Sequence, residues 1–196
     1  MNKKIVQKRI IIFASGAGSN AQKIIEYFKG NNHIKVVLIV SNNPNAGVIQ
    51  IASKENIPVL MIEKKLFNDT GYLSEIKKYH PDLIVLAGFL WKIPGILISF
   101  FHQKIINIHP ALLPAHGGKG MYGNAVHAAV VAAKEKESGI TIHFVDEKYD
   151  HGKTIFQAAC SVGENDNAET LAAKIHQLEH EFYPKEIDKL LSGENF

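Results

Sequence analysis

Short apolar runs recur along the first half of the chain and are separated by segments with a helical period. Five runs show little alternation of polar and apolar positions: Ile10–Ala14, Ile34–Val40, Val59–Ile62, Leu83–Ala87 and Ile105–Ile108. Runs of this kind are typical of parallel strands that are covered on both faces. The amphipathic segments between them predict helices at Asn20–Phe28, Val48–Glu55 and Tyr72–Tyr79. Pro94–Phe101 is apolar on all sides, which leaves its conformation open.

The pattern changes after residue 110. A stretch rich in Gly and Pro, Ala111–Gly123, predicts a long loop, and loops of this length in compact domains usually serve a function. Further elements are expected as a helix at Asn124–Lys134 and strands at Thr141–Val145 and Thr154–Ser161. The alternating order predicts an α/β fold with an open, mostly parallel twisted sheet and helices on both faces, a Rossmann-like arrangement.

A final helix is expected to begin near Asp166 and to continue towards Leu191. Glu169 follows Asp166 by three residues, as in a capping box. Pro184 should end or kink this helix, because proline cannot donate the backbone hydrogen bond that the helix interior requires.

The composition limits the possible classes of protein but does not identify the function. The 196 residues carry 46% hydrophobic and 21% charged side chains, which is ordinary for a globular chain, and we expect a single domain over residues 1–196. The net charge of +3 is too small and too dispersed to predict a nucleic-acid partner. No apolar run is long enough for a membrane span or a signal peptide. The single cysteine, Cys160, favours a reducing compartment and a cytoplasmic protein, and we expect its thiol to be buried and inert.

The first predicted strand runs directly into a glycine-rich turn, Ser15–Ala21. Small residues before a helix N-terminus let backbone N–H groups approach an anion. The turn also matches the dinucleotide pattern G-x-G-x-x-G/A, but that pattern needs an acidic residue at the end of the second strand. The chain has Ser41–Pro44 there, without an acid. A phosphate monoester is therefore the favoured ligand, and a tight turn without ligand is the alternative.

The segment IINIHP places Asn107 and His109 on one face of the fifth predicted strand. Ligands of open α/β sheets bind beyond the carboxyl ends of the strands, where this pair lies. An amide can stabilise an oxyanion, and an imidazole can transfer a proton. A carboxylate near His109 would raise its pKa and keep it protonated near neutrality. Asp146 and Asp150 are both candidates, and a purely structural role for the polar pair stays open.

Four ordered motifs together resemble the folate-dependent formyltransferases, over nearly the whole chain. They are Ser15–Asn20, Leu86–Leu90, Asn107–Pro114 and His143–Asp150. The resemblance implies a one-carbon group transferase of purine biosynthesis. It would move the formyl group of 10-formyltetrahydrofolate to the primary amine of 5'-phosphoribosylglycinamide (glycinamide ribonucleotide), through a tetrahedral intermediate and without metal. Both reactants are small molecules, and the folate is a cosubstrate.

The resemblance also implies roles for individual residues. Asn107, His109 and Asp150 correspond to the catalytic amide, imidazole and carboxylate. The expected ribonucleotide-binding residues are Gly18, Ser19, Asn20, His176 and Glu179. The expected folate-binding residues, which act largely through backbone groups, are Leu90, Trp91, Lys92, Ile93, Asn107, Asp146, Glu147, Lys148, Tyr149 and Asp150.

Three segments depart from the family pattern. Many relatives carry a folate-contacting arginine where this chain has Asn68–Gly71. The loop Ala115–Tyr122 and the pair Trp91–Lys92 also differ from the commoner forms. These differences bear on folate affinity and on loop contacts, and not on the type of reaction.

Several histidines have competing interpretations. His176–His180 spells H-x-x-E-H, a zinc-binding pattern, but few residues follow to supply a third ligand and we expect no metal. His143 either faces the site or is structural. The remaining histidines expected at the surface or at helix ends are His33, His80, His102 and His127.

Two alternatives to the favoured function remain. Another formyltransferase, or a hydrolase of the same family, would use the same catalytic residues on a different acceptor; such relatives usually carry an extra domain, for which this chain has no room. A non-catalytic nucleotide-binding module or a dinucleotide oxidoreductase would bind NAD(P) and transfer no formyl group.

Overall fold

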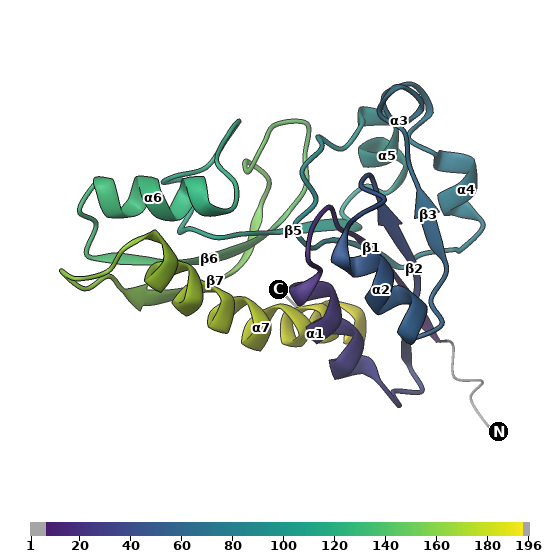
Figure 1. Ribbon diagram of the computed structural model, residues 1–196. Coiled ribbons are helices and arrows are strands. Elements are labelled where there is room, and N and C mark those ends of the chain that lie inside the picture. Colours follow the sequence, from purple (N-terminus) through teal and green to yellow (C-terminus); the bar gives the residue numbers. More distant parts are fainter. Residues whose placement is uncertain (1–6, 194–196) are drawn as a thin grey trace.

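The computed structural model describes residues 7–193, which form a single twisted sheet flanked by helices (Figure 1). The strand order is β3-β2-β1-β4-β5-β6-β7. Neighbouring strands from β3 to β5 pair in parallel, whereas β6 and β7 are antiparallel to their neighbours. The strands are β1 (Lys8–Phe13), β2 (Ile34–Ser41), β3 (Val59–Met61), β4 (Leu83–Leu86), β5 (Ile105–His109), β6 (Glu137–Phe144) and β7 (Thr154–Ser161).

Seven helices connect or follow the strands in the described part of the chain. They are α1 (Ser19–Phe28), α2 (Gly47–Lys54), α3 (Lys64–Thr70), α4 (Leu73–Lys77), α5 (Gly95–Phe100), α6 (Asn124–Ala132) and α7 (Ala168–Ser192). The long helix α7 packs against both α1 and α6, so it links the two halves of the molecule (Figure 1).

Alternate residues of the central strands supply two apolar cores, one on each face of the sheet. On β1, Ile10 and Ile12 belong to the core that α1, α2 and α7 cover, whereas Ile11 and Phe13 belong to the core that α3, α4 and α5 cover. All four side chains are fully buried. Burial of a side chain of this size is worth about 1.5–3 kcal/mol, so the continuous apolar run of β1 follows from burial on both faces.

The predicted α/β class and the positions of the five parallel strands are confirmed, and Pro94–Phe101 forms the short helix α5. The sequence analysis missed helix α3, and it began β6 four residues late, because the segment 137–140 contains Glu137 and Gly139. Gly139 is required there, since a Cβ would clash with the carbonyl oxygen of Ala158 on β7. The extent of the domain over residues 1–196 stays a prediction.

Two details of the last helix differ from the expectation. The capping box uses Asn167 and Thr170, one residue later than expected: the Asn167 side chain accepts a hydrogen bond from the Thr170 backbone N–H. Helix α7 also continues past Pro184 to Ser192, so the proline does not end it. The neighbouring Tyr183 is fully buried, and its hydroxyl donates to the Leu86 carbonyl at 3.0 Å, which fixes this turn against the carboxyl end of β4.

None of the helices within residues 7–193 is long and apolar enough to cross a membrane. Cys160 lies half-buried on the edge strand β7, and burial raises the pKa of its thiol.

Candidate active site

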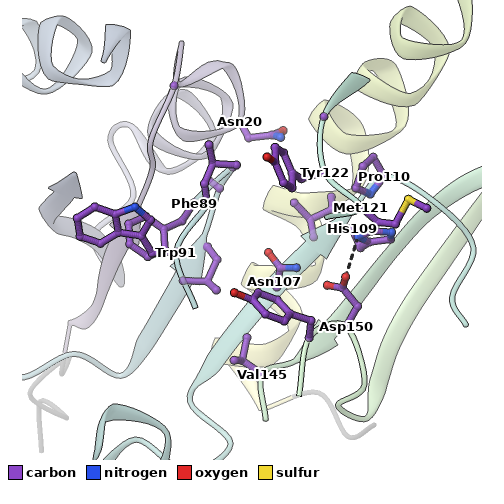
Figure 2. Close-up of a pocket in the computed structure, with 18 of the residues that line it drawn as sticks. Asn20, Phe89, Trp91, Asn107, His109, Pro110, Met121, Tyr122, Val145 and Asp150 are labelled. Carbon is purple, nitrogen blue, oxygen red and sulfur yellow. Dashed lines mark ion pairs between the residues drawn. The ribbon is translucent and has the colours of Figure 1, made fainter. Parts of the chain in front are cut away.

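A cavity of about 630 Å³ lies at the carboxyl ends of β1, β4 and β5, where the sequence analysis expected the ligand. Figure 2 shows Asn107, His109 and Asp150 on one side of it, with Phe89 and Trp91 on the other. Each predicted site residue except Glu147 lines this cavity. The Glu147 carboxylate instead points towards Gly95, at the start of α5.

Gly18 forms the tight turn between β1 and α1. Its φ of 84° lies in the left-handed region, and a Cβ at this position would approach Cβ of Val48 to 2.8 Å. Both constraints select glycine. The turn exposes the N-terminal N–H groups of α1 to the cavity, an arrangement that favours a phosphate.

Amide side chains hold this turn in place. Asn43, just after β2, donates from Nδ2 to the carbonyl oxygen of Ser15 at 3.2 Å. Dinucleotide-binding sites carry an acidic residue in this region, whereas here an amide stabilises the turn. Ser15 in turn accepts a hydrogen bond at Oγ from the Leu90 backbone N–H at 3.0 Å. The turn is therefore preorganised by contacts with both flanking strands.

Asn20 joins the glycine turn to helix α7. Its Nδ2 donates to Oε2 of Glu179 at 2.9 Å, and its own Oδ1 is buried without a partner among the described residues. Burial raises the pKa of Glu179, and the hydrogen bond from Asn20 and the charge of His176 offset part of this rise. A buried acceptor without a hydrogen bond is costly, which suits a site whose ligand supplies a donor.

His109 and Asp150 meet at the floor of the cavity, although they are 41 positions apart in the sequence. Oδ2 of Asp150 lies 3.5 Å from Nδ1 of His109, and it accepts the Gly118 backbone N–H at 2.9 Å (Figure 2). Nε2 of His109 lies 2.8 Å from the His116 carbonyl oxygen. Because a carbonyl only accepts, Nε2 carries a hydrogen and Nδ1 is the nitrogen that faces Asp150.

Asp150 itself has a backbone φ of 54°, in the left-handed region that aspartate tolerates better than most residues. Gly152 follows closely, and a Cβ there would clash with the carbonyl oxygen of Phe144. The tight turn therefore directs the carboxylate back towards β5. The structure distinguishes the two candidate acids, because Asp146 pairs instead with the exposed His151, at 3.2 Å.

His143 orients the Asn107 amide. Asn107 and His143 are register partners on β5 and β6, and Nδ2 of Asn107 lies 3.2 Å from Nε2 of His143. Nδ1 of His143 lies 2.9 Å from the Phe144 carbonyl oxygen and must donate to it. In the tautomer with its hydrogen on Nδ1, the ring accepts one amide hydrogen of Asn107 at Nε2, which also lies 3.6 Å from Oδ1 of Asp150. The second amide hydrogen of Asn107 is left for a ligand in the cavity.

The expectation that a nearby carboxylate raises the pKa of His109 and keeps the ring protonated near neutrality is wrong, because the net shift of this pKa is downward. Burial lowers the pKa of His109, and the charge of Asp150 and the contact with the His116 carbonyl restore only part of it. Burial acts in the opposite direction on Asp150, but the imidazoles of His143 and His109 and the Gly118 N–H outweigh it and lower the pKa of this carboxyl group. At neutral pH the pair is therefore a carboxylate beside a neutral imidazole.

Apolar side chains form the opposite side of the cavity. Leu90 is 53% exposed, whereas Ile93 is buried. The Trp91 ring packs against Phe67 and Phe89, with centroids 6.0 and 6.3 Å apart, so it is part of the core and also lines the cavity. This surface suits a flat aromatic ligand, and Lys92, Lys148 and Tyr149 lie at its margin.

The loop Gly118–Gly123, within the stretch Ala111–Gly123 for which the sequence analysis expected a function, lines the cavity, with Tyr122 57% exposed. One feature of the cavity escaped the sequence analysis. His127, expected at the surface or a helix end, is instead 97% buried on α6 and also lines the cavity, whereas His33, His80 and His102 are exposed as expected. A hydrophobic neighbour on each side of His127 was the only signal available, and it does not distinguish a buried from an exposed helical position.

The H-x-x-E-H segment does not assemble a metal site. The rings of His176 and His180 stack with centroids 6.1 Å apart. Within residues 7–193, no three His, Cys, Asp or Glu side chains are grouped so that they could hold a metal ion. His176 and Glu179 line the cavity, which places this helix face beside the ligand.

The fold and the site define an α/β protein with a phosphate-binding turn next to an amide–imidazole–carboxylate group. Residues 8–187 match the formyl transferase family, and the chain belongs to that family.

The relatives include the chloroplastic phosphoribosylglycinamide formyltransferase of Vigna unguiculata, which is 42% identical over 190 residues, or 94% of this chain. The chain spans 61% of that protein's length and 63% of its Arabidopsis thaliana counterpart. The phosphoribosylglycinamide formyltransferase of Bacillus subtilis is 38% identical and is matched over 97% of its length, with 96% of this chain covered. The crystal structure of the Bacillus halodurans enzyme of the same name superposes with a TM-score of 0.87 at 36% identity, over 96% of this chain and 97% of that one.

Proposed function

We propose that the protein transfers the formyl group of 10-formyltetrahydrofolate to the primary amine of 5'-phosphoribosylglycinamide, a reaction of purine biosynthesis. The observation that carries this proposal is the convergence of Asn107, His109 and Asp150 in one cavity with the Gly18–Asn20 turn. The names of the relatives support the same reaction. Both reactants are small molecules. The single cysteine favours a reducing compartment, which suits a cytoplasmic enzyme.

The two reactants would occupy different parts of the cavity. The phosphate would bind the N–H groups at the start of α1, with Gly18, Ser19 and Asn20 around it. His176 and Glu179 would approach the rest of the ribonucleotide. The folate would lie along Leu90–Ile93 and the loop Asp146–Asp150, where the apolar surface and the backbone groups suit a pterin ring. The volume of about 630 Å³ is within the range of ligand sites.

The first chemical step is attack of the substrate amine on the formyl carbon, which turns the formyl oxygen into an oxyanion. The free amide hydrogen of Asn107 is available to donate to that oxygen, because His143 fixes the other one. Removal of one such donor typically costs a factor of about 10²–10³ in turnover.

The attacking nitrogen becomes positively charged and must lose a proton. The neutral His109 and the ionised Asp150 together form the base that receives this proton. Once protonated, the imidazole is stabilised by Asp150 and lies beside the oxyanion, so it supplies positive charge in the intermediate. The same proton can return to the folate nitrogen as that nitrogen leaves, which balances the reaction without a metal ion.

The test is to mix the protein with 5'-phosphoribosylglycinamide and a 10-formyl folate and to follow the deformylated folate by absorbance. The signal should require the ribonucleotide. Asn107→Ala should lower turnover by about 10²–10³-fold while the far-UV circular dichroism spectrum is unchanged. Release of deformylated folate without ribonucleotide would instead identify a hydrolase of the family, and tight NAD(P) binding without formyl transfer would identify the dinucleotide-binding alternative.

A further inference from the structure

Helix α6 brings a second histidine into the ribonucleotide half of the cavity. His127, in the first turns of α6, is 97% buried and lines the cavity together with Asn20, His176 and Glu179. These side chains come from three helices that pack on one another, since α7 contacts both α1 and α6. Asn20 bonds to Glu179, and His176 precedes Glu179 by three positions on α7 and shares its face. His127 therefore lines the same cavity as the phosphate-binding turn, and helix α7 connects the two.

The surroundings of His127 indicate a missing partner. Its Nδ1 is buried and makes no hydrogen bond within residues 7–193. Burial lowers the pKa of His127, and the charges of His176 and His109 lower it further, so both imidazoles are within electrostatic reach. Positive charge on these rings is mutually unfavourable while the cavity holds no anion. A phosphate dianion among them would reverse this repulsion and accept a hydrogen bond.

We propose that His127 is a further substrate-binding residue, which donates an imidazole N–H to the phosphate group of the ribonucleotide and completes the site that the Gly18–Asn20 turn begins. This inference rests on the proposed function for the identity of the natural substrate. It assigns a phosphate contact to a residue of α6, so the phosphate would be bound from both α1 and α6, the two helices on which α7 packs.

The experiment measures the affinity of the intact chain for ribose 5-phosphate by calorimetry, without any folate. His127→Ala should weaken binding by about 10- to 100-fold, the loss expected for one hydrogen bond to a charged group. His127→Gln, which keeps an N–H donor, should recover part of that loss. The matched control is His180→Ala, because His180 also has a buried ring nitrogen without a partner in the described residues but does not line the cavity. The control should stay within about twofold of the parent affinity.

Competition by inorganic phosphate tests whether the contact is with the phosphate group, because His127→Ala should weaken the binding of inorganic phosphate by the same factor. In steady-state assays the KM for the ribonucleotide should rise, with kcat and the KM for folate nearly unchanged. A structural histidine would lower the melting temperature and leave the ribose 5-phosphate affinity intact, which would overturn the proposal. Loss of ribose 5-phosphate affinity with unchanged inorganic phosphate affinity would also overturn it. If formyl transfer is never observed but His127-dependent phosphate binding is, the proposed reaction fails and this inference stands.

Discussion

The Asp150 carboxylate can be replaced by an amide of the same shape, which separates its charge from its packing. In the parent protein Oδ2 accepts the Gly118 N–H at 2.9 Å and faces Nδ1 of His109 at 3.5 Å. The amide oxygen of Asp150→Asn can keep the first contact, so the tight turn should fold normally. The amide nitrogen would then take the place of Oδ1, which lies 3.6 Å from Nε2 of His143. The variant thus keeps the shape of the side chain and removes the negative charge that stabilises the protonated imidazole of His109.

The expected loss follows from the removal of this charge. Asp150 raises the pKa of His109 against the opposing effect of burial, so its removal makes the imidazole a weaker base. General acid–base catalysis contributes about 10²–10⁴-fold, and we expect kcat to fall within that range. The effect on the KM for the ribonucleotide should be small, because the phosphate-binding turn lies on β1 and α1, away from Asp150.

The matched control is Asp146→Asn in the same loop. Asp146 is partly exposed and pairs with His151 at 3.2 Å instead of with His109. Stopped-flow or steady-state absorbance with saturating folate should therefore give nearly the parent kcat for Asp146→Asn and a large loss for Asp150→Asn. Retention of more than about a tenth of the parent kcat by a folded Asp150→Asn variant would refute the proton-transfer role, given the range expected for such catalysis. Equal losses in both variants would show that the loop, and not this carboxylate, controls turnover.

Two further outcomes test the site and its support. Because the pKa of His109 is lowered from the ordinary value of 6.5, activity should be constant near neutrality and should fall as the pH drops through that lower pKa. A profile of kcat/KM against pH checks this. A loss of activity on acidification that begins with a pKa above 6.5 would contradict it. Tyr183→Phe should lower the free energy of unfolding by about 1–2 kcal/mol, because the buried Leu86 carbonyl loses its donor; urea denaturation measures this, and an unchanged midpoint would contradict the assignment.

The parallel half of the sheet was predictable because one physical signal determines it. Strands β1, β2, β4 and β5 are buried on both faces, and such burial leaves continuous apolar runs that the sequence displays. The same reasoning located the ligand edge, since parallel strands all end there. Helix α3 has no comparable signal: only Phe67 of its seven residues is buried, so its apolar stripe is too short to recognise.

The antiparallel half was harder to predict because its register depends on contacts between distant segments. Asn107 faces His143 only because β6 pairs with β5 in that register, after a connection of 27 residues between His109 and Glu137. A shift of one residue would turn His143 to the other face of the sheet and leave Asn107 without its partner. The sequence motif predicted the amide of Asn107 and the imidazole of His109. Only the pairing of β5 with β6 shows that a second imidazole, that of His143, orients the Asn107 amide.

The protonation state of His109 could not be predicted from the pattern of residues in the sequence. The sequence identified an acid that could lie near the imidazole, and the expected attraction was real, since Asp150 does raise the pKa of His109. The larger effect is the opposite one, desolvation, and it depends on how closely α6, the loop Gly118–Gly123 and β6 enclose the ring. Those segments follow His109 in the chain by 9 to 35 positions, and their packing has no local sequence pattern. In the proposed mechanism a neutral imidazole beside an ionised carboxylate would accept the substrate's proton, whereas an imidazolium would supply positive charge from the start. Burial lowers the pKa of His109 and so favours the first of these two roles.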